Sequence, residues 1–273
     1  MIERKHRYGN LVFDRDAIVR AALRAYFEAL FGEFPYRRLS FPACAVPRWT
    51  GDLQRGAFYN GNGCGDEDVV GWTEGGVVGL AYELGFGPIE WLDLPVDAVT
   101  GGPDDVRGAL PGLPAELEPA LVLAAGMLGE GAKHREKLAG VGFWLHGDSV
   151  AGTLFDDPIG PGAARLAAWG LLHNGRLLPV STQPGYWATV LECARTRDAS
   201  IHALIDTVVD RRLGGPTEFT TDELATLLPT PPAPEVLVGA QRMLQKVGIT
   251  WPGSPEIPEP PKPTGGNPFL PRP

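Results

Sequence analysis

Residues 58 to 68 read Phe58-Tyr59-Asn60-Gly61-Asn62-Gly63-Cys64-Gly65-Asp66-Glu67-Asp68. This stretch contains two Asn-Gly pairs and closes on three acidic residues. Asn-Gly pairs favour tight hairpin turns, because both residues tolerate positive φ. We therefore predict a turn between two strands at this point of the chain.

The residues that follow this turn have the composition of further strands. Residues 68–72 and 77–84 are predicted as consecutive strands, because apolar residues alternate or cluster between turn-forming residues. Residues 73–76, Thr-Glu-Gly-Gly, form the turn between them, and residues 89–94 are predicted to close an antiparallel meander.

Before the turn, residues 14–31 have apolar residues at helical spacing. Asp14 is placed to cap this helix and Gly32 to end it. The face predicted to meet water carries Arg15, Arg20, Arg24 and Glu28.

The C-terminal half is predicted to be mainly helical. Residues 220–223, Thr-Thr-Asp-Glu, match a capping box, and Gly248 is placed to end the last helix. The predicted helices are residues 115–128, 161–173, 186–195, 199–213 and 234–247.

These elements predict an α+β fold: an antiparallel β-meander with an N-terminal helix, a mainly helical C-terminal half and a disordered proline-rich tail. We predict an α+β domain over residues 1–100, a linker or long loop over 101–114, a mainly helical region over 115–251 and the tail over 252–273.

The formal net charge of −9 narrows the choice of partner. Nucleic acids and anionic membranes are themselves negative, so the charge disfavours both and favours a basic protein. The longest apolar stretch, residues 120–128, is too short to cross a bilayer. Cys44, Cys64 and Cys193 are odd in number and lack metal-ligand spacing, which predicts reduced thiols in a cytoplasmic protein.

Residues 147–149, Gly-Asp-Ser, with His146 beside them, invite interpretation as part of a serine hydrolase. A nucleophile elbow needs glycine two places after the serine, where this chain has Ala151. We therefore predict turn residues and assign no catalytic residue. A serine hydrolase using Ser149, with Asp148 and with His146 or His202, stays as an alternative.

Cofactor and metal motifs do not match either. A dinucleotide fingerprint over the alternating glycines of residues 61–65 would need glycine where Asp66 stands. An EF-hand register that begins at Asn60 places Gly71 where the final glutamate belongs. We therefore predict no cofactor and no metal site.

Residues 59–66 read Tyr-Asn-Gly-Asn-Gly-Cys-Gly-Asp, and residues 72–83 read Trp-Thr-Glu-Gly-Gly-Val-Val-Gly-Leu-Ala-Tyr-Glu. This segment resembles the glycine-rich turn and following hairpin of the SUKH superfamily. Many bacterial members of that superfamily are immunity proteins that neutralise toxins by binding them directly. The resemblance covers about residues 55–95, and residues 34–36 depart from the family's pattern. It implies a protein partner, such as a basic toxin domain.

The leading hypothesis is thus a non-catalytic protein-binding module of the immunity type. Acidic side chains would cover a basic surface of the partner, and exposed aromatic side chains would anchor the contact. The residues assigned to binding are Tyr59, Asp66, Glu67, Asp68, Trp72 and Glu74, with Trp91 as a further aromatic candidate. The aromatics could instead belong to the core. A third hypothesis is a scaffold or accessory protein that uses the proline-rich tail as a tether.

Overall fold

The computed structural model describes residues 1–6, 9–32, 47–61, 66–84, 104–131, 138–155, 199–228 and 234–253. The strands in these ranges are β1 (Ile2–His6), β2 (Gly9–Phe13), β3 (Arg48–Gly51), β4 (Gly56–Gly61), β5 (Asp66–Thr73), β6 (Gly76–Leu84), β7 (Leu138–His146), β8 (Ser149–Ala151), β9 (Thr217–Glu218) and β10 (Ile249–Thr250). The α-helices are α1 (Arg15–Gly32), α2 (Glu118–Gly131), α5 (Ala199–Leu213), α6 (Thr221–Leu227) and α7 (Pro234–Lys246). Short 3-10 helices are η2 (Asp104–Ala109), η3 (Ala115–Leu117) and η5 (Thr153–Phe155).

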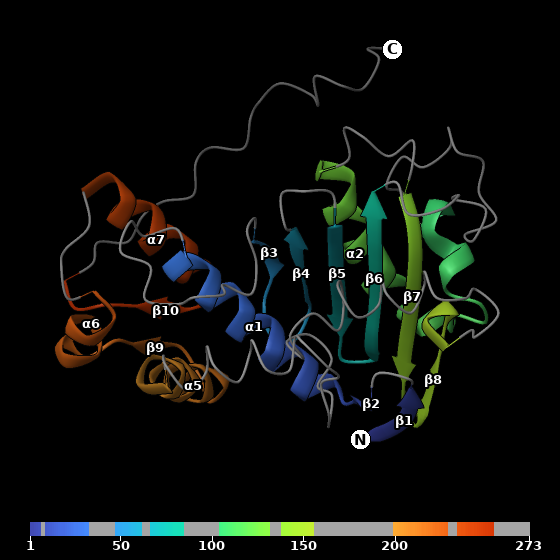
Figure 1. The fold of residues 1–273 in the computed structure, drawn as a ribbon, viewed down its shortest axis with the longest axis horizontal. Helices are drawn as coiled ribbons and strands as arrows, with labels where there is room; N and C mark the ends of the chain where they lie inside the picture. Colours follow the sequence, from blue (N-terminus) through green and yellow to red (C-terminus); the bar gives the residue numbers. More distant parts are fainter. Residues whose placement is uncertain are drawn as a thin grey trace, which may run out of the picture.

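A six-stranded antiparallel sheet forms the centre of the molecule, with its strands in the order β3-β4-β5-β6-β7-β8 (Figure 1). The predicted hairpins are confirmed: Asn60 pairs with Asp68 across β4 and β5, and β5 joins β6 through a turn at residues 74–75. The tip of the first hairpin, residues 62–65, lies outside the described residues. We predicted that a strand over residues 89–94 would pair with β6, and in the structure β7 pairs with β6. Residues 89–94 lie outside the described residues.

Both faces of the sheet are covered. On β5, Val70 and Trp72 join a core with α1, whereas Val69 joins a second core with α2. In Figure 1, α2 passes behind β5 and β6. The α2 backbone comes very close to the sheet at Gly71, where a Cβ atom would lie 2.4 Å from the carbonyl oxygen of Ala120. The sheet is therefore an internal layer between helices.

Two helices begin at the capping residues that the sequence predicts. The backbone N–H of Ala17 donates to Asp14 Oδ1 over 2.9 Å, so Asp14 caps α1 as predicted. Thr220 and Glu223 form the predicted capping box of α6. Hydrogen bonds from the Arg211 guanidinium to the Glu223 carboxylate lower the pKa of Glu223 below its usual range.

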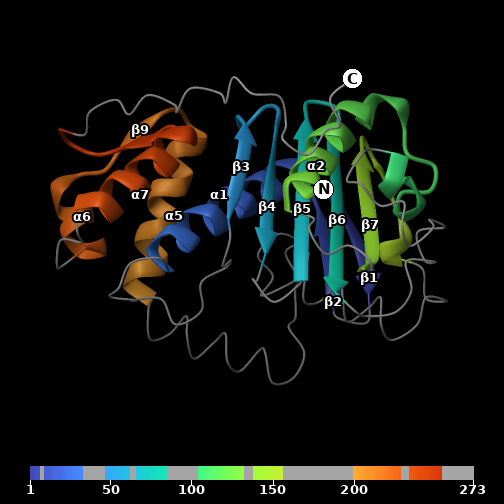
Figure 2. The same cartoon turned by 90° about the horizontal axis from the view of Figure 1, so that it is seen from above.

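The helices of the C-terminal half pack beside α1, at one end of the sheet in both views (Figures 1 and 2). Buried residues of α5 and α7, among them Ile205 and Leu244, belong to the same core as Phe27 of α1 and Trp72 of β5. The fold is α+β, with an N-terminal helix, an antiparallel sheet and then helices, as predicted.

The six-stranded sheet takes strands from two of the regions predicted from the sequence, residues 1–100 and residues 115–251. β7 and β8 belong to the C-terminal half, yet they complete the sheet begun by the N-terminal half. Within the predicted linker, η2 and the residue after it bury Val106, Ala109 and Leu110 against the sheet. Glycine and proline mark the turns of this stretch, but its three apolar side chains place it in the core. The predicted helices 161–173 and 186–195 and the tail from residue 254 lie outside the described residues.

Candidate functional site

The acidic residues assigned to binding do not form one site. Asp66 and Glu67 begin β5, whereas Glu74 lies in the turn after its last residue. At about 3.3 Å per residue, the two ends of this strand are about 25 Å apart. A single flat contact centred on residues 66–68 therefore does not include Glu74.

Asp68 is buried, with 2% of its surface exposed. It pairs with Asn60 on β4 and with Ala81 on β6, inside the sheet. It cannot cover a partner's surface in this position, so its assignment to an exposed acidic patch is wrong. The side chains of Asp66 and Glu67 are outside the described residues, and Glu74 is exposed.

The aromatic anchors are also wrong as exposed residues: Tyr59 is 4% exposed and Trp72 is fully buried. The Arg48 guanidinium lies over the Tyr59 ring, 3.8 Å from its centroid, on the α2 side of the sheet. The Trp72 ring lies 5.0 Å from that of Trp49, on the α1 side. The physical reason is that helices cover both faces of the sheet. Trp91 lies outside the described residues.

The structure instead gathers acidic side chains at the opposite end of the sheet from the Asn-Gly turn. Strand pairing brings the β3–β4 loop, the β5–β6 turn and the β7–β8 turn to this end, since Gly56 pairs with Trp72 and Gly76 with His146. The first residue of α1, Arg15, contacts the backbone of this end. The 3-10 helix η3 also lies here, because the carbonyl group of Glu116 is beside Gly75. Five exposed acidic residues lie here, and we call them together the acidic end: Asp16, Asp52, Glu74, Glu116 and Asp148.

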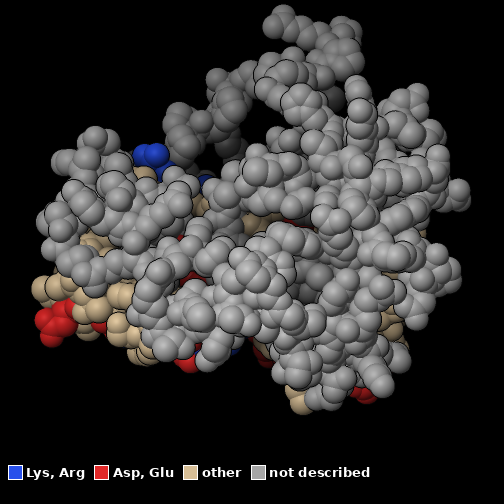
Figure 3. Space-filling model, in the orientation of Figure 1, with Lys and Arg blue, Asp and Glu red and all other residues tan. Residues whose placement is uncertain are grey.

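In the space-filling view, acidic atoms are visible at several separate places, the largest group at the lower left, where α6 lies (Figure 3). Cationic groups are present near the acidic end as well. The Arg55 side chain is exposed, and the amino group of Met1 lies 3.8 Å from Asp14 Oδ2. A third cation is Arg15, whose Nη1 donates to Asp16 Oδ1 over 2.7 Å. Among the described side chains, the five carboxylates of the acidic end outnumber these three cations, so the described charges there sum to a negative value.

Arg15, the first residue of α1, holds the backbone of the acidic end in place. Its Nε donates to the carbonyl oxygen of Thr73 over 2.7 Å. Its Nη2 donates to the carbonyl oxygens of Leu53 and Gln54 over 3.0 and 2.9 Å. One guanidinium thus ties the β3–β4 loop and the end of β5 to the start of the helix.

Further hydrogen bonds shape the same loops. Asp52 Oδ1 accepts from the backbone N–H groups of Gln54 and Arg55, at 2.7 and 2.8 Å. Trp72 Nε1 donates to the carbonyl oxygen of Asp52 over 2.9 Å. The acidic end is therefore built on fixed backbone. The role of Arg15 was not predicted from the sequence, although a cation in the first helical turn opposes the helix dipole and is a signal that it serves another purpose.

The Gly-Asp-Ser run forms a hairpin between β7 and β8. His146 pairs with Ser149 across the hairpin, and Gly147, with a φ of +54°, supplies the left-handed backbone that the tight turn requires. His146 Nδ1 lies 2.9 Å from the carbonyl oxygen of Gly75. Ser149 is exposed, and in the described part of the chain no hydrogen bond joins its hydroxyl to a histidine ring. His202 lies on α5, on the far side of the molecule from β8 in Figure 1.

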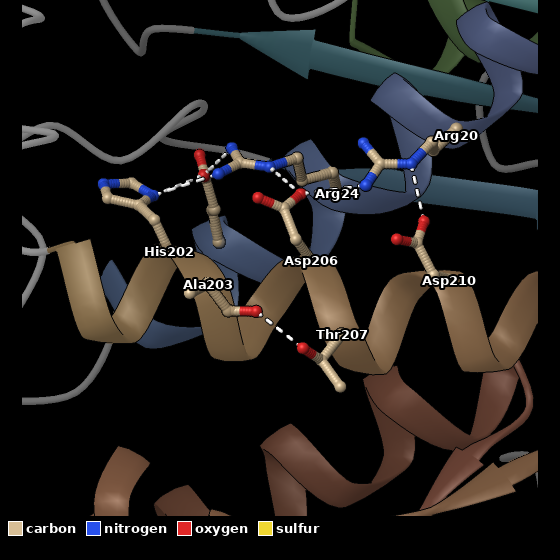
Figure 4. A network of polar contacts seen from close by, with 8 residues as sticks. Arg20, Arg24, His202, Ala203, Asp206, Thr207 and Asp210 are labelled. Carbon is tan, nitrogen blue, oxygen red and sulfur yellow. Dashed lines mark hydrogen bonds and ion pairs between the residues drawn. The ribbon is translucent and has the colours of Figure 1, made fainter.

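A second polar cluster, between α1 and α5, was not predicted (Figure 4). Arg20 donates to Asp210 over 2.7 Å and to Asp206 over 3.1 Å, and Arg24 donates to Asp206 over 2.9 Å. The hydrogen bond from Arg20 to Asp210 raises the pKa of the Arg20 guanidinium. The members of this cluster repeat every four residues on both helices, which places them on facing sides.

The inner end of the cluster is buried. Arg24 forms an ion pair with Glu28, which is fully buried, and its Nη2 lies 3.0 Å from His202 Nδ1. The prediction that Glu28 faces water is therefore wrong, because α5 and the residues around it cover that side of α1. The groups of the cluster face one another between packed helices, so we interpret them as a structural contact.

The described residues lack two kinds of feature, a metal-binding cluster and a membrane-spanning helix. They contain no group of three or more His, Cys, Asp or Glu side chains that could hold a metal ion. None of the described helices combines the length and apolar character that crossing a bilayer requires.

Comparisons with protein-family models, with curated proteins and with solved structures found no match to this chain.

Proposed function

We propose that this chain is a non-catalytic protein-binding module that meets a basic protein partner through its acidic end. The observation that supports the proposal is that five exposed carboxylates, from five separate segments, meet at one end of the sheet. Asp16 is already paired with Arg15. The other four carboxylates, Asp52, Glu74, Glu116 and Asp148, come from distant parts of the chain, and a basic partner would offset their mutual repulsion.

The fixed backbone of the acidic end supports the same function. Arg15 and the side chain of Asp52 hold the loops through hydrogen bonds to backbone groups. A preorganised site loses less conformational entropy on binding than a flexible one. Complementary charge also steers the encounter, so the association rate should fall with salt concentration.

The partner class follows from charge and from the resemblance to the SUKH superfamily. The formal net charge of −9 favours a basic protein over a nucleic acid. The resemblance implies an immunity-type role, so the partner we propose is a basic toxin domain that the chain neutralises in the cytoplasm by direct binding.

Neutralising part of the acidic end tests the proposal. The double variant Glu74→Gln, Asp148→Asn removes two exposed charges there, and Glu218→Gln, Asp222→Asn removes two exposed charges from β9 and α6. A partner captured from the native cell would be titrated against both variants and the parent by surface plasmon resonance at several salt concentrations.

The first variant should associate about fivefold more slowly and with a weaker salt dependence, whereas the second should match the parent within about twofold. Equal rates for both variants would show that the acidic end is not the contact. The immunity-type role has a separate test, in which co-expression of the chain should protect cells from the captured partner if that partner is toxic.

A further inference from the structure

We draw no further inference here: the strongest candidate, the uncharged outward side of helix α2 around the exposed Val122 and Gly126, is an apolar helix face, and nothing in the structure shows what covers it.

Discussion

Arg15 connects three parts of the chain that are far apart in sequence. Its guanidinium is mostly buried, with its side chain 20% exposed, and it donates to carbonyl oxygens at residues 53, 54 and 73. The bond to Gln54 is exposed, so water can replace the donor there. Thr73 is only 9% exposed, and its carbonyl group would be left with an unmet hydrogen bond. Arg15 therefore contributes to the stability and the geometry of the acidic end, together with the hydrogen bonds of Asp52 and Trp72.

Replacing Arg15 with alanine should lower the free energy of unfolding by about 2 to 3 kcal/mol, because hydrogen bonds from a charged donor are lost. Arg15→Lys should recover only part of this, since an ammonium group cannot match the fork of a guanidinium. Urea denaturation of the purified variants measures both effects.

The matched control is Arg55→Ala, in the same loop region, where the side chain is exposed. It should change the free energy of unfolding by less than about 0.5 kcal/mol. If Arg15→Ala and Arg55→Ala were equally stable, the hydrogen bonds of Arg15 would not hold the acidic end in place.

Ser149 is the residue on which the alternative of a serine hydrolase depends. We expect a fluorophosphonate probe not to label it, because a serine hydroxyl without an activating base is a weak nucleophile. Mass spectrometry of the probe-treated protein, with a known serine hydrolase as positive control, gives the measurement. Labelling that disappears in Ser149→Ala would establish the hydrolase instead.

At the scale of elements, the contact between α2 and the sheet requires glycine at one position, Gly71, and a second glycine, Gly126 of α2, lies away from this contact. Gly71 lies under the helix, where a Cβ atom would come within 2.4 Å of the Ala120 carbonyl oxygen. Gly126 lies on the outward side of α2, where a Cβ atom would meet nothing within 4 Å. The close approach of helix to strand needs glycine only at the first position.

Substituting alanine at each glycine should therefore change stability in opposite directions. Gly71→Ala should destabilise the protein by about 1 to 3 kcal/mol through overpacking. Gly126→Ala should stabilise it by about 0.5 to 1 kcal/mol, because alanine is the better helix former. Thermal and urea unfolding of the two variants measure these changes, and a stable Gly71→Ala variant would mean that α2 does not pack on the sheet at this point.

At the scale of the whole molecule, one core joins the sheet to the C-terminal helices. Ile205 of α5 is fully buried in the cluster that also contains Trp49 and Trp72 of the sheet. The ion pairs of Arg20 and Arg24 with Asp206 cross the same contact between α1 and α5. Two halves that share a core should unfold together.

Unfolding should therefore be a single transition, with tryptophan fluorescence and far-ultraviolet circular dichroism giving the same midpoint in urea. Ile205→Ala should lower the free energy of unfolding by about 2 to 5 kcal/mol and shift both signals equally. A fluorescence transition unaffected by this substitution would instead show that the sheet and the C-terminal helices unfold as two independent domains.

Much of the fold was accessible from local sequence. The Asn-Gly pairs near residue 61, the turn at residues 73–76 and the capping residues Asp14 and Thr220 all act over a few positions, so their effects follow from the residues next to them in the chain. The net charge of −9 likewise depends on composition alone.

Long-range packing decided the rest. Trp72 and Asp68 are buried because α1, α2 and the neighbouring strands surround β5. The order of residues within β5 does not show whether helices cover one face of the strand or both. Asp148 belongs to the acidic end because β6 pairs with β7, which places Gly76 beside His146, 70 positions away in the chain. The sequence alone therefore determined the turns, the helix ends and the overall charge, which depend on neighbouring residues or on composition. Only the tertiary structure decided which side chains meet solvent and which carboxylates lie together, because both depend on contacts between distant segments.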